Sequence, residues 1–180
     1  MRFEPTGIDQ LTVIVIERSA DPRGTFGRTF CREAFAAAGL EADFVQASTS
    51  VTLRRGTIRG MHFQRPPAAE TKLVRCVRGA IHDVVADLRP HSPTFLRWQA
   101  FRLGALEDRM LYIPPGCAHG FQTLCDDCEV LYQMSVPYTP GAADGFRFDD
   151  PACAISWPLP PEMISPNDLA WPPIAGRTAP

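Results

Sequence analysis

Short runs of β-branched and aromatic residues, separated by glycine, proline and aspartate, constrain the fold of this 180-residue chain more than any other feature. Such runs between turn-forming residues are typical of β-strands. Only residues 32–38 have the pattern of a helix. The sequence therefore predicts an all-β protein with a few short helices and with strands at residues 12–16, 25–30, 44–53, 57–63, 73–77, 80–88, 95–103, 110–113 and 129–136.

The order of these elements narrows the choice of architecture. Strands that follow one another without regular helices between them exclude βαβ units and leave a sandwich, a jelly roll or a barrel, of which the jelly roll fits best. Arg78 and Gly79 lie between two alternating runs, which predicts a tight hairpin. The proline-rich segment from Asp149 onward cannot supply interior strands, so we expect it to wrap the barrel or close one end.

Composition predicts one domain, residues 1–180, of a cytoplasmic protein. Hydrophobic residues make up 45% of the chain, enough for one core without disulfides or structural metals. Eighteen basic residues against 20 acidic ones leave a formal net charge of −2, so no overall basic field attracts nucleic acid. We find no signal-peptide pattern and no run near the roughly 18 apolar residues of a membrane span. We expect neither nucleic acid nor a membrane as a partner.

The six cysteines do not imply disulfides in a protein that is not exported. We expect them to stay reduced, as buried small hydrophobic residues or as surface thiols. Cys125 and Cys128 have the spacing of half a zinc site. Because no second cysteine or histidine pair stands at a suitable spacing, we do not predict structural zinc.

Two histidines lie in segments that resemble the two cupin motifs. His62 belongs to Gly-Thr-Ile-Arg-Gly-Met-His-Phe-Gln, and His119 to Pro-Pro-Gly-Cys-Ala-His-Gly-Phe. A metal-binding cupin needs a second histidine two residues after the first, because alternate strand residues face the same side of the barrel. Gln64 stands at that position and leaves His62, His119 and Glu70 as the only candidate ligands. We therefore predict a cupin-type jelly-roll barrel without a metal.

A cupin barrel would collect five chemically useful side chains in its interior: Arg59, His62, Lys72, His119 and Tyr132. This set suits removal of a proton next to a carbonyl group. A neutral imidazole accepts the proton, a cation stabilises the enolate oxygen, and a phenol returns a proton to carbon. The pattern alone leaves another interpretation open, in which the histidine is a hydrogen-bonded core residue and the tyrosine packs against the sheet.

Blocks along nearly the whole chain resemble, in order, those of the dTDP-4-dehydrorhamnose 3,5-epimerases. They lie at residues 21–26, 56–64, 72–79, 83–89, 92–94, 112–121, 138–140, 149–151 and 155–158. So many blocks at matching spacing are far more specific than either cupin motif alone. The resemblance implies an isomerase that needs no cofactor. Its substrate would be a nucleotide-linked 4-keto-6-deoxy sugar, inverted at C3, C5 or both.

The resemblance also implies catalytic roles. His62 is the base, oriented and made more basic by Asp168, since a carboxylate partner favours the charged imidazole. Tyr132 is the acid on the opposite face of the sugar ring. Lys72 and His119 lie near the reacting keto sugar.

Further residues are implied to bind the substrate. Arg59 and Arg23 hold the diphosphate, because guanidinium groups match phosphate geometry with paired hydrogen bonds. Phe26, Gln46 and Tyr138 seat the nucleotide or the sugar. In this family Arg23 and Phe26 come from the neighbouring subunit through exchanged N-terminal strands, so the resemblance implies a homodimer.

Four substrate-lining positions depart from the family pattern. Arg28 and Ala143 stand where glutamates are common, Ser48 replaces an asparagine, and Asn167 replaces a lysine. Two interpretations remain open: drift at the rim of the pocket, or a preference for a different base, sugar or ring substituent.

Other functions also fit the sequence. A related ketoisomerase would use the same enolate chemistry, but it has no need of the acid that Tyr132 provides. A cupin that binds a sugar nucleotide without catalysis, or a metal-dependent cupin oxygenase, is the alternative from a different class.

Overall fold

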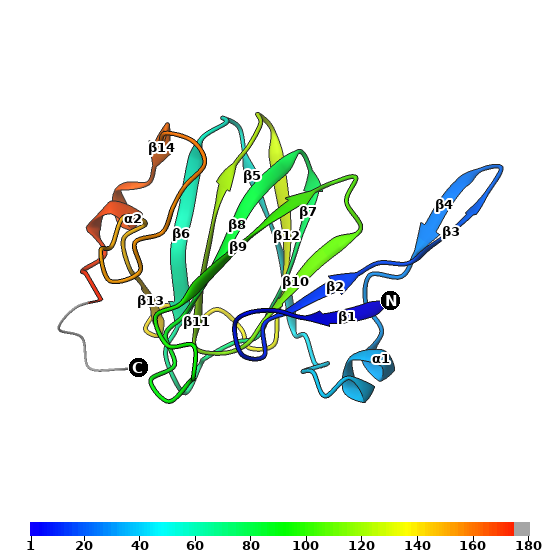
Figure 1. Cartoon of the computed structure of the whole chain (residues 1–180), viewed down its shortest axis with the longest axis horizontal. Helices are drawn as coiled ribbons and strands as arrows, with labels where there is room; N and C mark the ends of the chain where they lie inside the picture. Colours follow the sequence, from blue (N-terminus) through cyan, green and yellow to red (C-terminus); the bar gives the residue numbers. More distant parts are fainter. Residues whose placement is uncertain (175–180) are drawn as a thin grey trace.

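The computed structural model describes residues 1–174, and its main elements are two β-sheets (Figure 1). The first sheet contains, in spatial order, β1 (Arg2–Pro5), β2 (Thr12–Val15), β10 (Arg109–Ile113), β7 (Lys72–Arg78), β12 (Cys128–Met134) and β5 (Gln46–Thr52). The second contains β13 (Ala143–Gly145), β6 (Thr57–Gln64), β11 (Cys117–Thr123), β8 (Ala80–Asp87) and β9 (Trp98–Gly104), and β14 (Met163–Ile164) pairs with β6. The all-β prediction is confirmed.

Apolar side chains from both sheets fill the space between them. Val74 and Leu111 of the first sheet and Val85 and Phe121 of the second belong to one buried cluster. A second cluster covers the other face of the second sheet, where residues 146–157 pack against β6 and β8. The second sheet is thus buried on both faces, which holds its strands in fixed positions relative to the interior.

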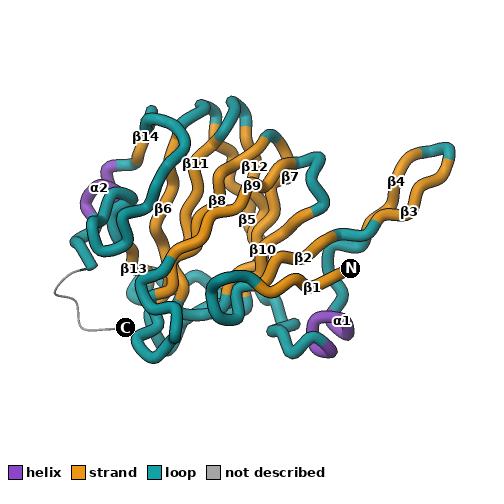
Figure 2. The backbone as a smooth tube through the Cα atoms, viewed as in Figure 1, coloured by secondary structure: helices purple, strands orange, loops and turns teal. Residues whose placement is uncertain are grey.

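Helices occupy only the margins of the fold (Figure 2). The first, α1 (Arg32–Ala37), was expected at residues 32–38, and its Phe35 packs into a third cluster with residues of β2, β7 and β10. The second, α2 (Pro166–Ala170), was not predicted. Neither is long and apolar enough to cross a membrane, and no other helix exists within residues 1–174.

The hairpin predicted at Arg78 and Gly79 is wrong. The strand before this turn, β7, pairs with β10 and β12 in the first sheet, whereas β8 pairs with β11 and β9 in the second. The turn therefore carries the chain between sheets. Gly79 has φ +77°, and a Cβ there would lie 2.7 Å from Cys128 Sγ, so the corner needs glycine. Alternation shows that a run is a strand but does not identify its partner.

The C-terminal segment runs along one edge of the second sheet. Here β13 pairs antiparallel with the end of β6, and β14 pairs parallel with its beginning. After β14, helix α2 lies beside β6. These elements bring residues that are distant in sequence next to the inward-facing side chains of β6.

A two-stranded hairpin projects away from both sheets (Figure 1). It consists of β3 (Arg18–Asp21) and β4 (Gly24–Gly27), which pair only with each other. Phe26, which lies opposite Ser19 in this hairpin, is 74% exposed. A large aromatic side chain so exposed is typical of a contact surface.

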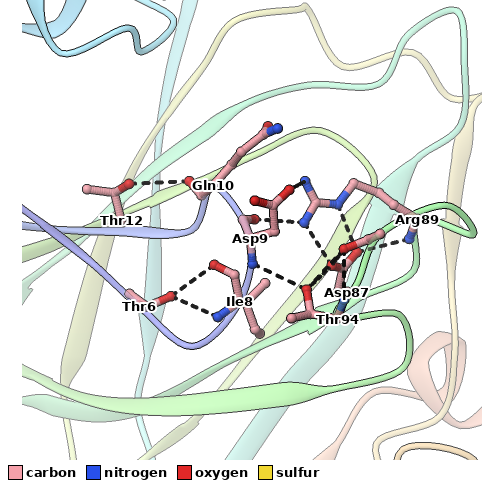
Figure 3. Close-up of polar contacts among 9 residues, drawn as sticks. Thr6, Ile8, Asp9, Gln10, Thr12, Asp87, Arg89 and Thr94 are labelled. Atoms are coloured by element: carbon pink, nitrogen blue, oxygen red, sulfur yellow. Dashed lines mark hydrogen bonds and ion pairs between the residues drawn. The ribbon is translucent and has the colours of Figure 1, made fainter.

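A polar network ties the β1–β2 loop to the segment between β8 and β9 (Figure 3). Asp87 is fully buried and accepts hydrogen bonds from Arg89, Ser92 and Thr94. Arg89 also donates to the carbonyl oxygen of Asp9 at 2.7 Å. Burial raises the pKa of Asp87, but these hydrogen bonds outweigh it and lower the pKa to about 2. The network anchors the end of β8 to the β1–β2 loop.

Candidate active site

A cavity of about 490 Å³ opens between the two sheets. Its walls come from β5, β7 and β12 on one side and from β6, β11, β13 and α2 on the other. Most of the residues predicted for the site line it: Ser48, Arg59, His62, Lys72, His119, Tyr132, Tyr138 and Asp168. The fold thus gathers residues from distant parts of the chain into one pocket.

An imidazole and a carboxylate form a pair at one side of the cavity. His62 Nε2 lies 2.6 Å from Asp168 Oδ1, and Gly60 N donates to Asp168 Oδ2 at 3.3 Å. Ser165 caps α2 by accepting a hydrogen bond from Asp168 N, which fixes the aspartate. Burial raises the pKa of Asp168, but the hydrogen bond and the charge of His62 outweigh it and hold the pKa below its usual value. The carboxylate therefore stays ionised and orients the ring.

A second histidine stands beside the first. His119 is directly opposite His62 in the register of β11 and β6, so both side chains point to the same face. His119 Nε2 lies 2.8 Å from Asp83 Oδ2, and both side chains are buried. Sequence reasoning missed Asp83. The signal was present, because Ile81, Asp83 and Val85 alternate along β8 and their two apolar members belong to the core.

Tyr132 reaches the cavity from the other sheet. Its ring centroid lies 5.8 Å from that of His119, in an edge-on arrangement. Burial raises the pKa of the phenol above its ordinary value, the carboxylate of Asp83 adds to this shift, and Arg59 opposes it. The phenol therefore remains protonated at neutral pH and is able to donate a proton.

Lys72 and Glu70 form an ion pair in the cavity wall. Lys72 Nζ lies 3.0 Å from Glu70 Oε1 and donates to the carbonyl oxygen of His62 at 3.2 Å. Their side chains are 13% and 5% exposed, respectively. The sequence presented Glu70 only as a candidate metal ligand, and its contact with Lys72 was not foreseen.

Of the remaining predicted binding residues on the two sheets, Arg59 and Ser48 line the cavity and Gln46 does not. Arg59 donates to Thr52 Oγ1 at 2.9 Å and to the carbonyl oxygen of Val51, which holds its guanidinium at the wall. Gln46 does not line the cavity, but its Oε1 accepts a hydrogen bond from Tyr138 N. Ser48 lies directly opposite Tyr132 in the register of β5 and β12.

In this chain the projecting hairpin and the residue that follows it lie outside the cavity. Arg23 and Phe26 are exposed on the hairpin, and Arg28 comes directly after β4. Arg23 forms an ion pair with Asp21 at 2.7 Å. Of the four departures from the family pattern, Ser48, Ala143 and Asn167 line the cavity and Arg28 does not.

Trp171 is another lining residue that sequence reasoning missed. Its ring stands 6.4 Å from that of His62, and its Nε1 is buried without a partner among the described residues. A Cβ on Gly145 would lie 2.7 Å from the indole. The absence of a side chain at Gly145 thus lets Trp171 pack against the backbone of β13, near His62.

The candidate metal ligands do not converge. Gln64 uses its amide within the fold: Nε2 donates to the carbonyl oxygen of Ala68, and Oε1 accepts from Thr139 N. Within residues 1–174, no group of three or more His, Cys, Asp or Glu side chains is arranged to hold an ion. Cys125 and Cys128 are free thiols whose sulfurs lie 3.6 Å apart.

The cavity therefore combines an oriented imidazole, a protonated phenol and an ammonium group. Such a set is able to remove a proton next to a carbonyl, stabilise the enolate and return a proton to carbon. The arginine at the wall adds a cation that suits an anionic group of a ligand.

Comparison with known proteins identifies the family. A profile describing dTDP-4-dehydrorhamnose 3,5-epimerase matches residues 5–176. The enzyme of that name from Methanothermobacter thermautotrophicus is 42% identical over 178 residues, covering 96% of this chain and 94% of the relative. A dTDP-4-dehydrorhamnose 3-epimerase from Streptomyces niveus is 40% identical, covering 93% and 81%.

A solved structure supports the same conclusion. The dTDP-4-dehydrorhamnose 3,5-epimerase from Bacillus anthracis, with TDP and PPi bound, superposes with a TM-score of 0.93 at 35% identity. The match covers 96% of this chain and 99% of that chain. It confirms the predicted cupin-type jelly-roll fold. The chain therefore belongs to the dTDP-4-dehydrorhamnose 3,5-epimerase family.

Proposed function

We propose that this chain inverts C3, C5 or both of a nucleotide-linked 4-keto-6-deoxy sugar, with His62 as base and Tyr132 as acid. Its family makes it a sugar-nucleotide epimerase, an isomerase. The observation that carries the assignment of roles is the cavity itself, in which the His62–Asp168 pair belongs to one wall and the protonated phenol of Tyr132 to the other. Inversion of a carbon requires that a proton leaves one face and that a proton is delivered to the opposite face. A base and an acid on different walls of the cavity fit this requirement.

The hydrogen bond to Asp168 selects the nitrogen that acts. Because the carboxylate is ionised and accepts from Nε2–H, the lone pair of the neutral ring is on Nδ1. His62 Nδ1 removes the proton on the carbon next to the keto group. The Asp168 carboxylate then stabilises the imidazolium that forms.

Enolate formation places negative charge on the keto oxygen. We assign its stabilisation to Lys72, with His119 beside it, because a fixed donor in a water-poor site is most effective where charge develops. Tyr132 then delivers a proton to the carbon from the opposite face. Arg59 binds the diphosphate, while Gln46, Ser48 and Tyr138 support the nucleotide or the sugar.

The experiment that tests the function is incubation with nucleotide 4-keto-6-deoxy sugars in deuterated water, followed by mass spectrometry. We expect deuterium at every carbon that is inverted, because the proton that Tyr132 delivers comes from a hydroxyl that has exchanged with the deuterated solvent. Label together with inverted configuration at both C3 and C5 identifies a double epimerase. Label at one carbon identifies a single-site enzyme, the activity for which the Streptomyces niveus relative is named. Turnover without solvent deuterium would contradict the proposal.

We also propose that the active unit is a homodimer in which the projecting hairpin serves the neighbouring site. Support comes from Phe26, which is 74% exposed, and from Arg23, which lies outside the cavity of its own chain. A second copy would then supply Arg23, Phe26 and Arg28 to the nucleotide.

Mixed dimers test this exchange. Arg23→Ala and His62→Ala chains, joined in one dimer and purified through two different tags, are expected to regain about half of the wild-type activity. One of the two sites then combines an intact base with an intact arginine. Each variant alone serves as the control. Mixed dimers that stay as inactive as the His62→Ala parent would contradict the exchange.

A further inference from the structure

The chain has 17 arginines but a single lysine, and that lysine lies in the wall of the catalytic cavity. An ammonium carries three N–H donors. Two of those of Lys72 are used within the protein, by Glu70 Oε1 at 3.0 Å and by the carbonyl oxygen of His62 at 3.2 Å. One donor is left for a ligand, so the orientation of the ammonium decides where that donor points.

Glu70 is well placed to set this orientation. It precedes β7, and the adjacent Thr71 forms two hydrogen bonds with Ser135. Thr71 N donates to Ser135 Oγ at 2.9 Å, and Ser135 N donates to the carbonyl oxygen of Thr71 at 3.1 Å. Two residues before it, the carbonyl oxygen of Ala68 accepts from Gln64. The backbone around the glutamate is therefore tied to both β6 and the end of β12.

Within residues 1–174, the carboxylate of Glu70 has one polar partner. Oε1 contacts Lys72, whereas Oε2 is buried and has no hydrogen-bond partner among the described residues. A buried carboxylate is normally satisfied on both oxygens, because an unmatched one loses its hydration without compensation. Among the described residues, the Lys72 ammonium is thus the only polar partner of the Glu70 carboxylate.

We propose that Glu70 is a positioning residue that holds the ammonium of Lys72 so that its free N–H meets the keto oxygen of the sugar. This inference rests on the role proposed above for Lys72. A lysine side chain has four rotatable bonds, and a fixed acceptor removes the cost of ordering it during the reaction. Glu70 acts through Lys72 and does not touch the reacting atoms.

Three substitutions separate positioning from charge. Glu70→Ala is expected to lower kcat about 10²-fold, the size of effect that follows a misplacement of about 1 Å, with little change in KM. Glu70→Asp keeps the charge but shortens the reach, and we expect kcat to fall about tenfold. Glu70→Gln keeps an acceptor for Nζ, and its amide nitrogen replaces an oxygen without a partner. We therefore expect its kcat to stay within about threefold of wild type.

A double-mutant cycle tests whether Glu70 acts through Lys72. In a Lys72→Ala background, replacement of Glu70 by alanine should cause no further loss of kcat. Losses that multiply, a glutamine variant as slow as the alanine variant, or an aspartate variant as fast as wild type would each overturn the proposal. TDP binding, measured by calorimetry, shows whether each variant is folded. If the alanine variant does not fold, the kcat values of the aspartate and glutamine variants test the proposal.

The single lysine allows a readout that does not depend on turnover. In protein labelled with ¹⁵N at the lysine side chain, one ammonium signal is expected, and it should remain ordered in wild type and in Glu70→Gln. The same signal should become mobile in Glu70→Asp. An equally ordered signal in the aspartate variant would contradict positioning by Glu70, even if the epimerase assay itself failed.

Discussion

Replacement of His62 by alanine is expected to lower solvent-deuterium incorporation at every exchanging carbon by at least about 10³-fold, to below detection. No other described group is placed to replace the lost base. Lys72 donates to Glu70 and to a backbone carbonyl, and His119 is engaged by the buried Asp83. Both histidines contact a carboxylate through Nε2, but the imidazole of His62 is 44% exposed, whereas that of His119 is only 5% exposed. The measurement is the rate of label uptake by mass spectrometry at a saturating concentration of substrate.

A matched control is available in the same chain. His91 is exposed in the segment between β8 and β9, away from the cavity, and His91→Ala should exchange deuterium as fast as wild type. TDP binding by both variants should be close to that of wild type, because the diphosphate contacts are assigned to arginines. Undiminished exchange in His62→Ala would refute the assignment of the base.

The fold was predictable where the signals are local. β-Branched residues and alternation identify most strands, and they led to the correct all-β class. The strand β11 was not predicted, because none of its first six residues, Cys-Ala-His-Gly-Phe-Gln, is β-branched. Only Thr123, at its end, is β-branched. All seven of its residues are buried, since it lies between β6 and β8. Pairing on both sides stabilises it in place of local propensity.

The site shows the same division. His62 and His119 stand out in short motifs, whereas Asp168 is 106 residues away from its partner and was named only through the family resemblance. Asp83 was not assigned its contact with His119, because pairs across strands depend on a register that a single sequence does not reveal. Glu70 stands only two residues before Lys72, but it was considered only as a metal ligand. The hairpin predicted at Gly79 was wrong because the two strands that flank it, β7 and β8, belong to different sheets. The sequence of the strands does not reveal which partners they pair with.

Replacement of Tyr132 by phenylalanine is expected to separate exchange from inversion. The ring and its contact with His119 remain, but the phenolic proton is lost. His62 still removes the substrate proton, so deuterium continues to enter from the face of the base. Delivery to the far face stops, and we expect inverted product to fall by about 10² to 10⁴ while some label uptake persists. The assay measures the amount of deuterium in the sugar and the fraction of inverted product in the same sample.

The same chemical change elsewhere provides the control for Tyr132→Phe. Tyr112 is buried in the cluster beside α1, where its hydroxyl accepts a hydrogen bond from Glu41 N at 3.0 Å. Tyr112→Phe should lose about 1 kcal/mol of stability and keep full epimerase activity. Because burial raises the pKa of the Tyr132 phenol, the acid is protonated throughout the neutral range, so the defect of Tyr132→Phe should not depend on pH there. Normal inversion in Tyr132→Phe would show that the proton reaches the far face from another donor.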